Sequence, residues 1–99
     1  MMKFYHATTK DRAEKIKKEG VIKSFSGGVF LCKNPADSCK FLAIRGIEEM
    51  TVIEVNLKVK EVKESFDHSQ AFFQCKAYIH AGDIILRGNE NIVDYKFDF

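Results

Sequence analysis

The chain has no tryptophan, one proline, three cysteines and no long apolar run. Cys32, Cys39 and Cys75 form no CxxC pair and are odd in number, which argues against a disulfide-stapled secreted domain and predicts no metal site. No apolar stretch approaches the roughly 20 residues that span a bilayer. No secretory leader is recognisable, because Lys3 is followed at once by strand-like residues and then by a charged helix. We therefore expect a soluble, cytoplasmic protein with reduced thiols and no membrane contact.

The chain also has little excess of either charge, since its net charge is only +2. The charged residues are unevenly placed: residues 1–50 carry ten Lys or Arg against six Asp or Glu, whereas residues 51–99 carry six against eight. A basic N-terminal half suits a small ligand that bears phosphate. The excess is too weak for the basic stripe of a duplex-binding module. We expect a small anionic ligand rather than nucleic acid.

The length predicts a single domain over residues 1–99, because 99 residues with 45% apolar content fit one core and no segment has linker composition. At this size one core must supply the net stability. Most of the nine phenylalanines are therefore needed for packing rather than for chemistry.

The first predicted helix runs from Lys10 to Glu19. Thr8 or Thr9 can cap its N-terminus through a hydroxyl, and Gly20 stands where a left-handed residue ends a helix. Its five cations have two open interpretations, a solvated face or a surface that meets a pyrophosphate or an acidic partner. These cations are Lys10, Arg12, Lys15, Lys17 and Lys18.

The second predicted helix begins at Asn34, which acts as N-cap before Pro35, and ends before Gly46. Strands are predicted around the two helices from apolar or alternating composition. They cover residues 2–8, 29–32, 50–62, 72–79, 84–88 and 92–99. In the long third strand, alternation predicts one buried face, which holds Thr51, Ile53, Val55, Leu57 and Val59. This order predicts an α+β domain with a mostly antiparallel sheet.

Two segments resemble a known family. "FYHATTK", from residue 4, and "GGVFLCKNPADSCKFLA", from residue 27, resemble the first and second motifs of the ADP-ribosyltransferase superfamily, in its diphtheria-toxin-like His-Tyr-Glu branch. Small rifamycin-modifying ADP-ribosyltransferases and tRNA 2′-phosphotransferases have a similar layout. The resemblance covers residues 3–45 well and residues 50–86 only by strand pattern. It implies a small ADP-ribosyltransferase-like fold with two helices packed on a split sheet.

The resemblance also implies a site for NAD or a related ADP-ribose nucleotide. His6 matches the family's histidine, and Phe30 matches its tyrosine, which stacks on the nicotinamide ring. The cleft would be lined by His6, Ala7, Thr8, Gly28 and Phe30. The residues alone leave two interpretations of His6, because a histidine at a strand end either contacts a ligand in a cleft or bonds a nearby backbone carbonyl. Phe30 is likewise either a stacking residue or plain core.

The third family residue, a carboxylate, is missing from the matching strand. Possible registers place Ala77, Gln74 or Lys76 at that position, and Gln74 is the residue that we assign to the catalytic set with His6 and Phe30. A carboxylate there would stabilise the oxocarbenium-like transition state, so its loss predicts weak turnover or none. The nearest acids, Asp67 and Asp83, lie in predicted turns.

Two functions from different classes follow. The first is an ADP-ribosyltransferase-like domain that binds NAD or a related nucleotide, with weak or no transferase or NAD glycohydrolase activity. The alternative is a non-catalytic interaction protein, of the kind a mobile element encodes, that inhibits a protein partner or sequesters a nucleotide.

Overall fold

The computed structural model describes residues 2–24, 28–36, 38–39, 46–64, 77–88 and 90–96 of the chain. Within these ranges one complete α-helix, one short 3-10 turn and eight strands are present. No helix among the described residues is long and apolar enough to cross a membrane. The class is α+β, as the sequence predicts.

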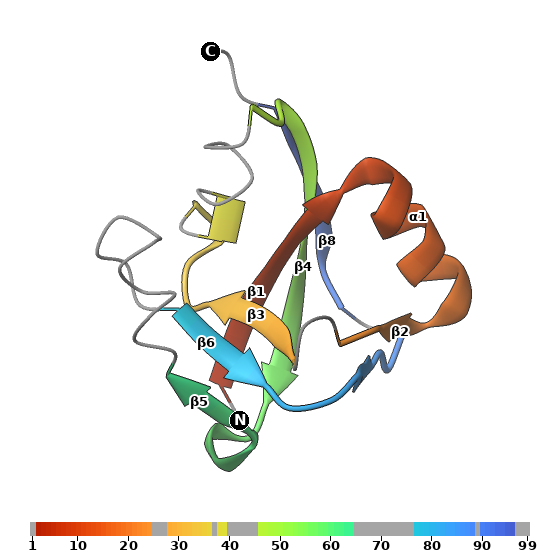
Figure 1. Ribbon diagram of the computed structural model, residues 1–99. Coiled ribbons are helices and arrows are strands. Elements are labelled where there is room, and N and C mark those ends of the chain that lie inside the picture. Colours follow the sequence, from red (N-terminus) through yellow and green to blue (C-terminus); the bar gives the residue numbers. More distant parts are fainter. Residues whose placement is uncertain are drawn as a thin grey trace.

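Six strands make the main sheet (Figure 1). They are β1 (Met2–Thr9), β3 (Val29–Cys32), β4 (Glu49–Leu57), β5 (Val62–Glu64), β6 (Ala77–His80) and β8 (Ile92–Lys96). Their order is β5-β6-β3-β1-β4-β8, and each neighbouring pair is antiparallel. A second, two-stranded sheet pairs β2 (Val21–Ile22) with β7 (Ile84–Ile85). The predicted antiparallel pairing is therefore confirmed.

The helix α1 (Lys10–Glu19) begins and ends where the sequence predicts. The Thr9 hydroxyl accepts the Arg12 amide at 3.4 Å, so Thr9 rather than Thr8 is the N-cap. At the other end Gly20 has a φ of 72°, and its amide donates to the Ile16 carbonyl at 2.7 Å. Only glycine adopts this left-handed conformation without strain, which explains the stop.

The second predicted helix starts as expected, at residues that have helical backbone. The Asn34 side chain accepts the Ala36 amide at 2.8 Å, and the Asn34 carbonyl accepts the Ser38 amide at 3.1 Å. The remainder of this prediction, residues 37 and 40–45, lies outside the described residues. The described part of the chain thus holds one complete helix and the first turn of another.

Both faces of the main sheet are buried. On one face, which we call the helix face, Phe4 packs with Leu31 and Ile53 beneath Ile16 of α1 and Ile22 of β2. On the opposite face a smaller cluster is built from Cys39, Met50 and Val52, with Tyr5, Ala7, Ile47 and Tyr95 against it. Each fully buried large side chain contributes about 1.5–3 kcal/mol by leaving water.

The sequence prediction for residues 50–62 is partly wrong. Strand β4 ends at Leu57, and a 3-10 turn, η1 (Val59–Glu61), leads into β5. Val59 is 60% exposed rather than on the buried face, because the chain has left the sheet. The first half of β4 is buried on both faces instead of one, since segments of the chain cover each side of the sheet there.

Candidate functional site

His6 lies in the centre of β1, opposite Ile53 of β4, so its ring projects from the helix face. Its Nδ1 atom is 3.0 Å from the backbone oxygen of Phe30. A carbonyl can only accept, so Nδ1 carries the proton in this contact and Nε2 of the neutral ring is an acceptor. This contact is the carbonyl-bonded arrangement that the sequence left open, and it holds the ring in one orientation.

The surroundings keep His6 neutral. Burial lowers the pKa of the imidazole below its ordinary 6.5, and the positive charge of Arg12 lowers it further. The Phe30 carbonyl acts in the other direction without offsetting burial. The side chain therefore offers a ligand an acceptor nitrogen rather than a positive charge near pH 7.

A cleft of about 290 Å³ opens between α1 and β2, and His6 lies in its wall. We call it the α1 cleft. Its charged lining comprises Arg12, Lys15, Glu19 and Lys23, of which Glu19 pairs with Lys23 at 3.7 Å. The remaining lining is hydroxyl-bearing or apolar, from Thr8, Ser24, Ile16, Val21 and Ile22. Three cations against one acid give this cleft a positive potential.

The segment that follows β2 is hydrogen-bonded to the turn before β7. The Ser24 amide donates to Asp83 Oδ1 at 2.7 Å, across 59 positions of sequence. This hydrogen bond, with a contribution from Lys23, keeps the pKa of Asp83 below its usual value. Asp83 therefore stays ionised next to the mouth of the α1 cleft, although it is not part of the cleft lining.

The predicted site residues do not all meet in one cleft. His6 and Thr8 do line the α1 cleft, and Thr8 is only 5% exposed. Ala7 packs against the cluster on the opposite face. The Phe30 ring also projects to that face, because Val29 and Leu31 on either side of it belong to the helix-face core. The expectation that the rings of His6 and Phe30 share a cleft is thus wrong, and strand alternation is the reason.

Gly28 has a packing role at the start of β3. A Cβ atom at this position would lie 2.5 Å from Ile79 Cγ1 and 2.8 Å from the His80 carbonyl oxygen. The glycine thus allows β6 to approach the start of β3 closely.

Ala77 is one of the positions that could match the family's carboxylate. Its methyl group is fully buried and packs with Cys32, so this position supplies no negative charge. Gln74, Lys76 and Asp67 lie outside the described residues. Among the described residues, no group of three His, Cys, Asp or Glu side chains is placed to hold a metal ion.

Sequence reasoning did not identify Lys23 and Ser24, and it left the helix cations undecided. The structure divides those cations: Arg12 and Lys15 line the cleft, whereas Lys10 pairs with Glu49 at 3.7 Å on the surface. The i, i+3 spacing of Arg12 and Lys15 was the available signal, because residues so spaced share one helix face.

Family models, curated proteins and solved structures were each compared with this chain, and none matches it. The functional assignment therefore depends on the geometry and chemistry of the α1 cleft.

Proposed function

We propose that this domain binds NAD or a related ADP-ribose nucleotide in the α1 cleft and has little or no ADP-ribosyltransferase activity. The observation that carries the proposal is the placement of Arg12, Lys15 and Lys23 around a neutral histidine. The order of β1, α1, β2 and β3 over residues 2–32 supports an ADP-ribosyltransferase-like fold for the same region.

Different residues of the cleft lining match the diphosphate, the ribose and the base of such a ligand. A diphosphate is met by Arg12, whose guanidinium can make paired charge-assisted hydrogen bonds, together with Lys15. Ribose hydroxyls can donate to Nε2 of His6. The apolar wall formed by Val21 and Ile22 suits the face of a base. The cleft volume is near the lower end of ligand pockets, so it holds one half of a dinucleotide and the rest extends outward.

The same lining opposes transfer chemistry. Breaking the bond between nicotinamide and ribose develops positive charge on the sugar, which needs a nearby carboxylate. The α1 cleft presents an excess of cations, and its one acid, Glu19, is paired with Lys23. The Phe30 ring, which would stack on nicotinamide, is on the other face of the sheet. Binding without rapid turnover is the expected behaviour.

Calorimetric titration with NAD, ADP-ribose and ADP tests the proposal, alongside an assay of nicotinamide release. Arg12→Gln should weaken binding about two- to fivefold, the effect expected for the loss of one exposed charge pair. Lys18→Gln is the matched control, because Lys18 is an exposed cation on α1 that does not line the cleft. Equal affinity in the native protein and Arg12→Gln would refute the assignment of the cleft.

The second candidate is the non-catalytic interaction protein. It is favoured by two exposed apolar side chains on outer strands of the described sheets: Ile85 on β7 is 78% exposed and Val93 on β8 is 49% exposed. Apolar side chains on sheet edges invite pairing with another chain. If none of the three nucleotides binds, this second candidate is preferred.

A further inference from the structure

A second hollow lies on the face of the main sheet opposite the helix face. It has a volume of about 260 Å³, and its lining comes from β1, β4, β8 and the residues next to β8, with Pro35 added from the first turn of the second helix. Two tyrosines, Tyr5 and Tyr95, belong to this lining. We call it the tyrosine pocket. It shares no lining residue with the α1 cleft.

The base of the tyrosine pocket is part of the smaller buried cluster. Val52 is 3% exposed, and Tyr5 and Tyr95 pack against the same cluster. The register of the sheet explains this grouping, because Tyr5 is paired with Glu54 and Val52 with Val93. Side chains of paired residues lie on the same face. The three strands therefore bring two phenol rings, a carboxylate and an aliphatic base together.

Glu54 is the one ionised side chain among the described residues that line this pocket. It is largely buried, and its Oε1 atom accepts a hydrogen bond from Asn91 Nδ2 at 3.5 Å. The Tyr5 hydroxyl is hydrogen-bonded to the same carboxylate. Burial, followed by the charge and hydrogen bond of Glu54, raises the pKa of Tyr5 above its ordinary 10.0, so this phenol stays neutral. The pocket thus presents one negative charge beside phenol rings.

Lys3 contacts Glu54 from outside the pocket. Its Nζ atom is 3.7 Å from Glu54 Oε1, but the Lys3 side chain is 64% exposed and does not line the pocket. A pair with one solvated partner contributes little, because a long side chain must be ordered to hold it. Lys3 is therefore a weak competitor for the carboxylate.

We propose that the tyrosine pocket binds the alkylammonium group of a small organic cation. The faces of phenol rings attract cations, and quaternary ammonium groups are recognised by aromatic side chains in this way. The methyl groups of such a cation match the aliphatic surface of Val52 and Val93, and Glu54 supplies the opposite charge. This site is independent of the nucleotide proposal, because the two hollows lie on different faces of the sheet.

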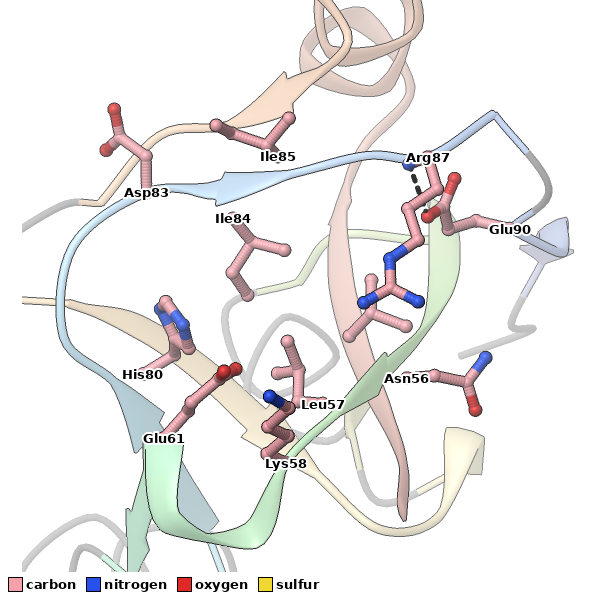
Figure 2. A pocket seen from close by; sticks show the side chains of 11 residues that line it. Asn56, Leu57, Lys58, Glu61, His80, Asp83, Ile84, Ile85, Arg87 and Glu90 are labelled. Carbon is pink, nitrogen blue, oxygen red and sulfur yellow. Dashed lines mark hydrogen bonds between the residues drawn. The ribbon is translucent and has the colours of Figure 1, made fainter. Parts of the chain in front are cut away.

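A third hollow, around β7, provides a comparison (Figure 2). Its volume is about 200 Å³, and its charged lining comprises Glu61, Asp83 and Glu90 against Lys58 and Arg87. No tyrosine or phenylalanine is among its described lining residues. Both hollows carry an excess of one acid, but only the tyrosine pocket adds aromatic rings. An organic cation should therefore prefer the tyrosine pocket.

Amide-resolved NMR titration with choline chloride tests the site, with sodium chloride at matched ionic strength as the reference. Saturable shifts are expected at the amides of Val52, Glu54 and Val93. The neutral alcohol in which carbon replaces the nitrogen of choline has the same shape, and it should bind about fivefold more weakly because it has no charge. Equal binding of the two compounds, shifts around β7 alone, or the same changes with sodium chloride would overturn the proposal.

Four variants sharpen the result. Glu54→Gln should weaken choline binding about fivefold, because it removes the opposite charge and keeps the size of the side chain. Tyr95→Leu should weaken it about two- to fivefold through loss of one ring. Lys3→Gln removes the competitor and should tighten binding, and the exposure of Lys3 means that the fold is not at risk. Glu49→Gln is the matched control, because Glu49 is an exposed acid of β4 outside the pocket lining.

Two results in the variants would contradict the site. One is choline affinity that is the same in Glu54→Gln and Glu49→Gln. The other is weaker choline binding in Lys3→Gln, which would mean that Lys3 does not compete for the carboxylate.

Discussion

The Nδ1 atom of His6 and the backbone oxygen of Phe30 are 3.0 Å apart, so a side chain of β1 is hydrogen-bonded to the main chain of β3. These strands share only one described residue pair, Tyr5 with Cys32. The histidine therefore supplements a short backbone pairing at the centre of the sheet. The same hydrogen bond fixes the orientation of the His6 ring in the wall of the α1 cleft.

Replacing His6 by alanine should destabilise the fold. The variant loses the bond to Phe30, and a side chain–backbone bond of this kind contributes about 0.5–1.5 kcal/mol. Urea denaturation followed by circular dichroism gives the change in unfolding free energy. His80→Ala is the control, because the His80 bond to the Gly82 carbonyl is exposed and spans only a turn. An equal loss in both variants would contradict the structural role of His6.

The native protein should lose stability when the pH falls below the ordinary histidine pKa of 6.5. The pKa of His6 is lower in the folded state than in the unfolded state, so the unfolded chain binds more protons in that window. The contribution is fully present above the unfolded pKa and is lost as the pH falls toward the folded one. Carboxylates titrate mainly below this range. Denaturation curves at several pH values should show a slope that is smaller in His6→Asn; identical slopes would argue against a shifted His6.

Gly28→Ala should destabilise the protein by about 1–3 kcal/mol, the usual cost of overpacking. The added methyl group would lie 2.8 Å from the His80 carbonyl oxygen, and a backbone atom cannot easily move away. Gly20→Asn is the comparison, because that site has open space and asparagine tolerates a left-handed backbone. Thermal unfolding of both variants measures the difference. A neutral Gly28→Ala would mean that β6 can shift away from β3.

Asp83→Asn tests whether an acid beside the α1 cleft supports turnover. We expect nicotinamide release to stay at background in the native protein and in this variant, because Asp83 is engaged with the Ser24 amide and does not line the cleft. Asp67→Asn is the parallel variant for the other nearby acid. Robust native release that either substitution abolishes would show an active enzyme and identify its carboxylate.

Local features of the chain were predictable because their causes are local. The bounds of α1 follow from a threonine cap and a glycine stop. The strands that carry His6 and Phe30 follow from apolar composition. The end of β4 at Leu57 was missed, because the alternating pattern continues through the 3-10 turn that follows.

The amino-acid sequence by itself determined the α+β class, the position of α1 and the presence of His6 on a strand. Only the tertiary structure decided which side chains share a cleft. Alternation along β1 and β3 sends His6 and Phe30 to different faces, and the register that sets those faces depends on contacts between distant segments. The bond from Ser24 to Asp83 spans 59 positions, and no local pattern could reveal it.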